Sequence, residues 1–189
     1  MEAMLRDHGP ALVDLARRSI RHGLDHGGPL VVDPVTLPEA LRHNGACFVT
    51  LTIDGALRGC IGSPQAWRPL AQDVAENAWR TAFHDPRFPP LTDAEWPRIA
   101  VSLSVLTPPE PFPVSDEADL IARLRPGVDG LILGDGDGGA RGLFLPAVWE
   151  TLPDPQEFVA HLKHKAGLPT GYWSDTLTVE RFTAKSVKG

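Results

Sequence analysis

The sequence predicts an α+β fold in which a mainly antiparallel sheet is flanked by helices. Segments 46–53 and 99–106 alternate apolar residues with small or polar ones, the pattern of strands that bury one face. The pair Asp54-Gly55 directly follows the first segment and is a strong signal for a β-hairpin. Helices and strands mix without strict βαβ order, which favours antiparallel over parallel strands.

The N-terminal third is expected to form a helix, a loop and the hairpin. Apolar residues recur at helical spacing from Glu2 to about Leu24, and glycines and prolines then break the helix. The segment 46–53 is the outgoing strand. Residues 56–61 form the return strand after a type I′ turn.

A second helix and a stiff loop are expected next. Ser63 and Pro64 open a helical stretch that runs to about Phe83, with Pro69 in its first turn, where a missing N–H costs little. The dipeptide at 85–86 ends this helix, because a residue before proline avoids helical backbone angles.

The second half of the chain is expected to mix short helices and strands. Turn and capping residues divide it into segments of four to twelve residues. These segments are a helix at 115–124 capped by Ser115, strands at 128–133 and 142–145, a helix at 155–166 and a strand at 176–183.

Length and charge limit the function. The 189 residues can form one large domain, or a domain with a subdomain. A net charge of −6 and a pI of about 5.6 disfavour nonspecific binding to nucleic acid or to anionic membranes. The two cysteines exclude a disulfide scaffold and a four-cysteine zinc site.

The N-terminal residues include acids and lack the apolar centre of a signal peptide. No apolar run approaches the roughly 20 residues that a membrane span needs. We therefore expect a cytoplasmic protein with no membrane partner and no nucleic-acid partner, whose cysteines stay reduced.

The return strand of the hairpin carries the sharpest candidate site, in the segment Leu57-Arg58-Gly59-Cys60-Ile61-Gly62. With a regular two-residue turn, Leu51 faces Arg58 and Val49 faces Cys60, so both residues share the face of Cys47. An arginine beside a cysteine favours the nucleophilic thiolate. This pattern predicts Cys60 as a catalytic residue and Arg58 as its tuning cation.

The alternative for this segment is structural. Free cysteine is among the most buried residue types, so Cys60 can be a small core residue. Gly59 and Gly62 then serve only to let neighbouring backbone approach.

A second candidate lies in the proline-stiffened segment Phe83-His84-Asp85-Pro86-Arg87-Phe88-Pro89-Pro90. A rigid loop can present the Asp85 carboxylate and the Arg87 guanidinium to a substrate. We expect both to line one pocket with Arg58 and Cys60. In the alternative, Asp85 and Arg87 pair with each other or cap a backbone group.

The glycine-rich stretch Gly134–Gly139 matches the dinucleotide pattern G-x-G-x-x-G only formally. The residues after it read as a strand, so no helix N-terminus is available for a pyrophosphate. A calcium loop starting at Asp135 would place Pro146 where a glutamate is required. We interpret the stretch as a hairpin turn and expect no cofactor.

His161 and His164 are one helical turn apart, a spacing that can hold a metal. No third ligand follows them in the sequence, so a solvated helix face is the preferred interpretation and no metal site is expected. Lys165 stands near the end of the same helix, where a cation suits the helix dipole.

These motifs together resemble the AMMECR family. The matching segments occur in the family's order and cover nearly the whole chain, from the first helix to Phe182. The most specific of them is Arg-Gly-Cys-Ile-Gly. The segments are 47–51, 57–62, 85–90, 104–107, 130–133, 143–146 and 165–168.

The resemblance implies a single AMMECR-like domain over residues 1–189, with a larger sheet-and-helix part and a smaller subdomain. It implies that signature residues gather near a cleft between these parts. Gly59, Gly62, Arg87 and Lys165 are then expected to bind substrate beside Cys60. Bacterial members of this length are named protein A of the AmmeMemoRadiSam system, which implies a MEMO-like protein and a radical SAM protein as partners.

Two functions follow from these expectations. In the first, the chain is a component of an AmmeMemoRadiSam enzyme system that handles a small molecule at a substrate cleft around the Arg-Gly-Cys-Ile-Gly segment. In the second, it is a non-catalytic adaptor that binds a MEMO-like or radical SAM protein. The first requires an accessible Cys60, and the second requires an exposed apolar or aromatic patch.

Overall fold

The computed structural model describes residues 1–136 and 139–189 of the chain. These residues form two compact units. Unit 1 comprises Met1–Pro108 together with Lys185–Gly189, and unit 2 comprises Pro109–Ala184. Each unit has its own sheet and its own hydrophobic core.

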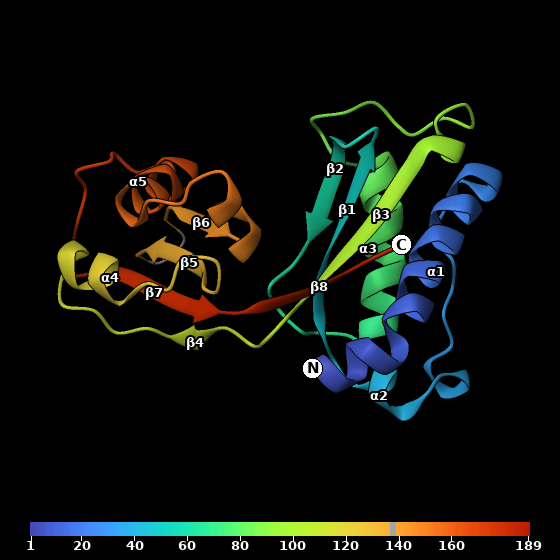
Figure 1. The fold of residues 1–189 in the computed structure, drawn as a ribbon, viewed down its shortest axis with the longest axis horizontal. Helices are drawn as coiled ribbons and strands as arrows, with labels where there is room; N and C mark the ends of the chain where they lie inside the picture. The colour runs from blue at the N-terminus through green and yellow to red at the C-terminus, as the bar shows by residue number, and fades with distance from the viewer. Residues whose placement is uncertain (137–138) are drawn as a thin grey trace. The chain divides into compact units, whose positions relative to one another are not determined.

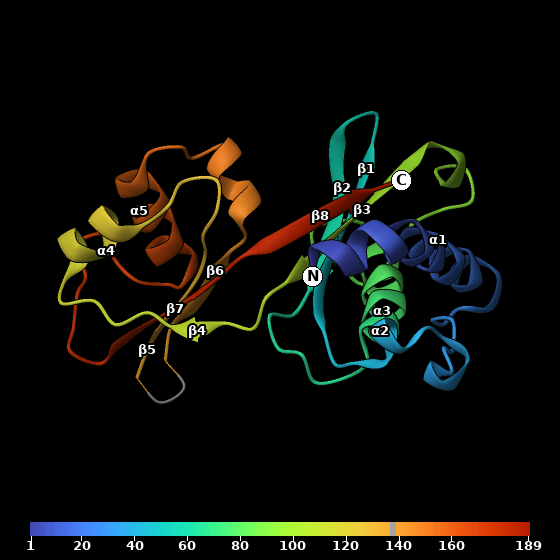
Figure 2. The same cartoon turned by 60° about the horizontal axis from the view of Figure 1, so that its bottom comes forward.

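Unit 1 is a sheet with helices packed on one face. The sheet has the strand order β2-β1-β3-β8, and β1 is antiparallel to both of its neighbours. Figures 1 and 2 both show α1 and α3 on the same side of this sheet. The elements are α1 (Glu2–His26), α2 (Glu39–Arg42), β1 (Ala46–Ile53), β2 (Ala56–Gly62), α3 (Leu70–Phe83), β3 (Ile99–Leu106) and β8 (Ala184–Lys188), with short 3-10 helices at Pro34–Thr36 and Trp96–Arg98.

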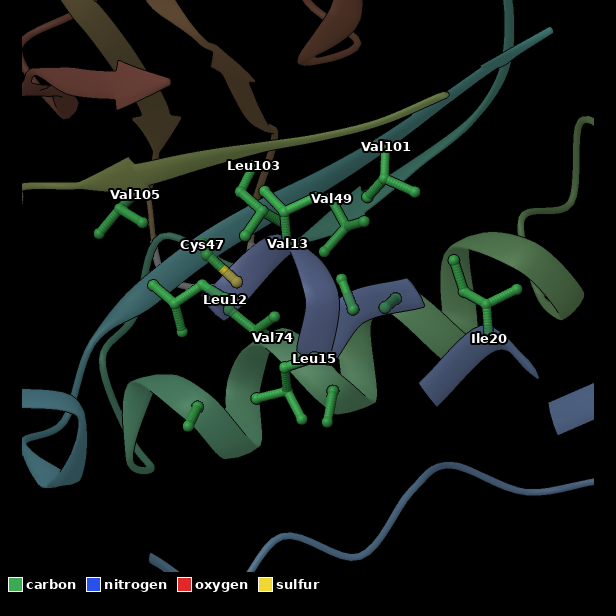
Figure 3. Close-up of a cluster of buried hydrophobic side chains, with 14 of the residues drawn as sticks. Leu12, Val13, Leu15, Ile20, Cys47, Val49, Val74, Val101, Leu103 and Val105 are labelled. Atoms are coloured by element: carbon green, nitrogen blue, oxygen red, sulfur yellow. The ribbon is translucent and has the colours of Figure 1, made fainter. Parts of the chain in front are cut away.

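The core of unit 1 lies between the sheet and the two long helices. Cys47, Val49 and Leu51 of β1 pair with Val105, Leu103 and Val101 of β3, and all six are buried. Figure 3 shows Cys47 and Val49 pointing toward side chains of α1 and α3. The alternation in the sequence therefore predicted this face correctly.

The other face of the sheet is more polar and carries several hydroxyl groups beside Phe48. Across β1 and β3, Thr50 pairs with Ser102 and Phe48 pairs with Ser104. All four are half-buried. This face carries hydroxyl groups where the first carries methyl groups, and it is the face of Cys60, which pairs with Thr50.

Unit 2 is a second antiparallel sheet, with the order β4-β7-β5-β6. Its core includes Trp149 and Phe158, whose rings stack at 3.8 Å. The elements are β4 (Glu110–Pro111), α4 (Glu117–Arg123), β5 (Gly130–Asp135), β6 (Arg141–Phe144), a 3-10 helix at Pro146–Glu150, α5 (Pro155–Lys165) and β7 (Leu177–Phe182). The α+β class is thus confirmed in both units.

Two helix starts differ from the sequence expectation. Helix α3 begins at Leu70 and not at Ser63, because the carbonyl of His43 accepts the Leu70 N–H at 2.9 Å and fixes the first turn there. Helix α4 is capped by Asp116 in place of Ser115, since the Asp116 carboxylate accepts the Asp119 N–H. Strand β8 was not expected at all.

The glycine-rich stretch joins β5 to β6, so the residues after it form a strand, as expected. Residues 137 and 138 of that predicted turn lie outside the described residues. None of the helices in the described part of the chain combines the length and the apolar character that a membrane span requires.

Candidate functional site

Strand β2 contains a β-bulge that determines where Cys60 lies. The hairpin turn is of the expected type, with positive φ at both Asp54 (52°) and Gly55 (82°). Leu57 pairs with Thr52, but the next paired residue is Gly59, opposite Leu51. Arg58 is therefore an extra residue in β2.

The bulge shifts the register by one residue, and such a shift moves the following side chains to the other face. Cys60 pairs with Thr50 and not with Val49. The expectation that Cys60 shares a face with Cys47 is therefore wrong. The two sulfur atoms lie on opposite faces of the sheet.

Arg58 is buried, and its charge is paired. Its Nε donates to Glu95 at 2.7 Å and its Nη2 donates to the carbonyl of Pro89 at 2.9 Å. Hydrogen bonds from the Arg58 side chain, with those from the backbone and hydroxyl of Thr92, outweigh burial and hold the pKa of Glu95 at about 2. Arg58 thus fastens the segment 84–98 to β2, and the thiol is not among its hydrogen-bond partners.

Asp85 supports the backbone of Cys60. It is 4% exposed, and its Oδ2 accepts the N–H of Cys60 at 2.9 Å. Strand β2 stands at the edge of its sheet, so this carboxylate satisfies a strand group that has no neighbouring strand. Hydrogen bonds from the Arg87 side chain, with those from the backbone of Cys60 and Arg87, outweigh burial and hold the pKa of Asp85 well below its usual range.

Arg87 completes the support. Its Nη2 lies 2.7 Å from Asp85 Oδ2 and donates to the carbonyl of Cys60 at 3.4 Å. Asp85 and Arg87 therefore pair with each other and also bind the backbone of Cys60, and their expected role in presenting charge to a substrate stays a prediction. The Arg87 side chain is nonetheless 53% exposed, so it also presents a fixed positive charge.

The structure thus gathers Arg58, Cys60, Asp85 and Arg87 with Glu95 into one group, which we call the Cys60 cluster. The guanidinium groups of Arg58 and Arg87 lie 5.7 and 5.5 Å from the ring centre of Phe88. Glu95 was not predicted from the sequence, although Thr92-x-x-Glu95 has the spacing of a capping box. Glu95 indeed accepts the N–H of Thr92 at 2.9 Å.

The two thiols have different surroundings. Cys60 is half-buried, and the hydroxyl of its strand partner Thr50 donates to the sulfur at 3.3 Å. Cys47 is buried, and its sulfur donates to the Asp73 carboxylate at 3.3 Å. Burial, together with the negative charge of Asp73, raises the pKa of the Cys47 thiol well above its usual range.

Gly59 and Gly62 allow close packing. A Cβ on Gly59 would lie 2.6 Å from the carbonyl oxygen of Thr81 on α3. A Cβ on Gly62 would overlap the carbonyl of Cys47. The structural alternative for the glycines is supported, while their expected role in substrate binding stays a prediction.

Lys165 belongs to unit 2. Its Nζ donates to the carbonyl of Leu143 at 2.8 Å and lies 5.1 Å from the ring centre of Phe144. On the same helix His161 and His164 are exposed. Among the described residues no group of three or more His, Cys, Asp or Glu side chains is arranged to hold a metal ion.

Comparison with known proteins identifies the family. The sequence profile of the AMMECR1 family matches residues 13–187 of the chain. The chain belongs to the AMMECR1 family. The resemblance inferred from the sequence motifs is thereby confirmed.

The relatives within the AMMECR1 family match over nearly their whole length. A protein of Methanothermobacter thermautotrophicus is 44% identical over 182 residues, covering 95% of this chain and 93% of that protein. A protein of Methanocaldococcus jannaschii is 37% identical, covering 98% of this chain and 92% of that protein. The crystal structure of an uncharacterised protein from Pyrococcus horikoshii has a TM-score of 0.85 at 37% identity, covering 94% of this chain and 89% of the other.

Proposed function

We propose that this AMMECR1-family chain is a component of an AmmeMemoRadiSam enzyme system, with the Cys60 thiol as its reacting group. The observation that carries the proposal is that both backbone polar groups of Cys60, its N–H and its carbonyl, are hydrogen-bonded to charged side chains. Asp85 accepts its N–H, and Arg87 donates to its carbonyl. A reacting group needs such a rigid frame, because small misplacements cost rate.

The surroundings of the thiol suit a nucleophile or a redox group. The Thr50 hydroxyl donates to the sulfur and so fixes the position of the thiol beside the strand. The exposed part of Arg87 supplies a charge that stays positive at any working pH. The substrate expected from this geometry is a polar or anionic small molecule whose charged group pairs with Arg87.

The predicted site residues then take different roles. Cys60 reacts and Arg87 binds the substrate. Asp85 holds both of them in place through its hydrogen bonds. It is not assigned as a general base, because a carboxylate with a strongly lowered pKa is a poor proton acceptor. Arg58 anchors the loop through Glu95.

A non-catalytic adaptor is the second candidate. The observation that favours it is Trp67, which is 62% exposed and stacks on the guanidinium of Arg68 at 4.3 Å. Exposed tryptophan and arginine are the residue types that most often carry protein–protein affinity. The expected partners in either case are a MEMO-like protein and a radical SAM protein.

Co-expression with these two proteins from the same genome tests both functions. Metabolites are compared in cells that carry the wild type, Cys60→Ser or Cys47→Ala. The proposal predicts that Cys60→Ser removes the metabolite difference made by the wild type while a complex with the partners persists, and that Cys47→Ala keeps both. Full activity of Cys60→Ser would overturn it.

The adaptor function predicts a different pattern in the same cells. Trp67→Ala would lose the complex, and Cys60→Ser would change nothing. A loss of metabolites with Trp67→Ala but an intact complex would argue against the adaptor.

A further inference from the structure

Two histidines lie one turn apart at the end of α1, outside the Cys60 cluster. His22 and His26 are separated by four positions, a spacing that places two side chains on one face of a helix. Their rings stack with a centroid distance of 4.4 Å and an interplanar angle of 24°. His22 is half-buried and His26 is exposed, so the pair lies at the surface of unit 1.

The backbone at the helix end fixes the tautomer of both rings. Gly27 ends α1 with a positive φ of 78°, and the carbonyl of the following Gly28 lies 2.8 Å from His22 Nδ1. The carbonyl of His22 lies 3.3 Å from His26 Nδ1. A carbonyl oxygen only accepts, so each Nδ1 carries the proton, and each neutral ring keeps its lone pair on Nε2.

Both Nε2 atoms are available to a ligand. In the described part of the chain neither of them takes part in a hydrogen bond. No buried side-chain nitrogen of the described residues lacks a hydrogen-bond partner, so solvent reaches Nε2 of the half-buried His22. An Nδ1–H bonded to a backbone carbonyl, with Nε2 left free, is the arrangement that orients histidines to ligate a metal ion.

The charges on α1 do not oppose a bound cation. The arginines of this helix within one turn of the pair are Arg18 and Arg21. Arg18 pairs with Asp14, and Arg21 is shared between Asp25 and Asp93. The last turn of a helix also carries partial negative charge, which favours a cation there.

We propose that His22 and His26 together bind one divalent transition-metal ion through their Nε2 atoms. Imidazole nitrogen suits Ni²⁺, Cu²⁺ and Zn²⁺, whereas Mg²⁺ and Ca²⁺ take oxygen ligands. The nearly parallel rings must turn to converge on one ion, and His26 provides this movement. Its ring is exposed, its hydrogen bond is long, and the second side-chain torsion of histidine is soft. With two protein ligands in place of four, the bound ion keeps open positions for water.

The chain contains a matched comparison on α5. His161 and His164 are also exposed and lie three positions apart. In the described part of the chain they form neither a side-chain hydrogen bond nor a ring contact, so their tautomers are not fixed in advance. The proposal therefore predicts that the pair on α1 binds the metal more tightly than the pair on α5.

Titration of the full chain with Ni²⁺ at about pH 7.5, where imidazole is mostly neutral, tests the proposal. Calorimetry should show one site, and excess Mg²⁺ should not displace the Ni²⁺. His22→Gln and His26→Gln should each weaken binding at least about tenfold, because each removes a ligand. The double variant His161→Gln/His164→Gln should leave the affinity within about twofold.

A thiolate is the main competing ligand, so the titration is repeated with Cys60→Ser, which should leave the affinity unchanged. Each variant is first checked for a cooperative thermal transition. If His22→Gln does not fold, the exposed His26 still decides the question, since unchanged affinity in His26→Gln contradicts the proposal.

Other results would also overturn the assignment. They are the absence of Ni²⁺ binding, loss of binding with Cys60→Ser, and binding of equal strength at the two histidine pairs, which would indicate an adventitious ion only. Proton–nitrogen NMR of the metal-free chain should show the Nδ1–H tautomer for His22 and His26. An Nε2–H tautomer at His22 would contradict the preset site.

Discussion

The backbone N–H and carbonyl of Cys60 are hydrogen-bonded to two charged side chains, those of Asp85 and Arg87. Asp85 is almost fully buried, yet it accepts hydrogen bonds from the N–H groups of Cys60 and Arg87 and from the Arg87 guanidinium. A buried carboxylate with that many donors is stabilised in its ionised form. The contribution of the Asp85 carboxylate to the free energy of unfolding can therefore be measured separately from any activity.

Asp85→Asn is expected to lower the free energy of unfolding by about 2 kcal/mol at neutral pH, because hydrogen bonds to charged groups are worth about 1.5–3 kcal/mol. Urea unfolding measures the change. Asp93→Asn is the control, since Asp93 pairs with Arg21 at the surface with 73% of its side chain exposed. The control should cost less than about 0.5 kcal/mol, and an equal cost in both variants would contradict the assigned role.

The difference in unfolding free energy between the wild type and Asp85→Asn should depend on pH. The pKa of Asp85 is lowered in the folded chain, so its stabilising effect is complete above the unfolded value of about 4 and is lost as the pH falls below it. The stability gap between the wild type and Asp85→Asn should narrow from about pH 5 toward about pH 2. A gap that stays constant or widens over this window would show that the carboxylate charge is not what stabilises the site.

At the scale of elements, the bulge in β2 separates what the sequence predicts from what it does not. The alternation in 46–53 and 99–106 predicts both strands and their buried face, and Asp54-Gly55 predicts the turn. Nothing local shows that Arg58 is an extra residue, because the bulge arises where β2 meets α3 and the segment 84–98. The face of Cys60 was therefore predicted wrongly, although its segment was identified.

Strand β8 is a second feature that the local sequence does not predict. Residues 184–188 contain one large apolar residue, and the strand exists because it pairs with β3, about 80 residues earlier in the chain. The charged partners of the site were similarly hidden, since Glu95 lies 37 residues from Arg58. Local patterns predict elements, whereas these contacts depend on the tertiary fold.

Arg58→Met is expected to destabilise the chain by about 2 kcal/mol, because it leaves the half-buried Glu95 without its partner. It should change the alkylation rate of Cys60 less than about threefold, since the Arg58 charge is paired with Glu95. Thermal unfolding and alkylation of the folded protein measure the two effects. A large loss of Cys60 reactivity at unchanged stability would restore Arg58 as the cation that tunes the thiol.

Gly59→Ala tests how closely β2 approaches α3. The added methyl group would lie 2.6 Å from the Thr81 carbonyl, so backbone must shift, at a cost of about 1–3 kcal/mol. Gly28→Ala is the matched control, because nothing lies within 4 Å of its added Cβ. Equal denaturation midpoints for the two variants would contradict the packing described for α3.

At the scale of the whole molecule, the two cysteines cannot crosslink without rearranging the sheet. Figure 3 shows Cys47 among the core side chains, whereas the pairing of Cys60 with Thr50 places Cys60 on the opposite face of the sheet. The intact mass of the purified chain under non-reducing conditions should therefore correspond to two free thiols. A mass lower by two hydrogens would contradict the register of β1 and β2.

The family match extends over residues 13–187, so both units belong to the shared fold, and the α+β class follows from sequence and structure alike. The proposed chemistry, in contrast, depends on one side chain in unit 1. We propose that Cys60 is the reactive thiol of this molecule and that Cys47 is not.

Alkylation of the folded chain near neutral pH, followed by mass spectrometry of peptides, tests that claim most directly. Cys60 should react on the order of a hundredfold faster than Cys47, which is buried and reacts only when the core opens. Thr50→Val should slow Cys60 several-fold, because it removes the hydrogen bond that positions the sulfur, while Thr52→Val on the same face should not. Faster reaction of Cys47, or equal rates for the two thiols, would show that Cys60 is not the reactive thiol.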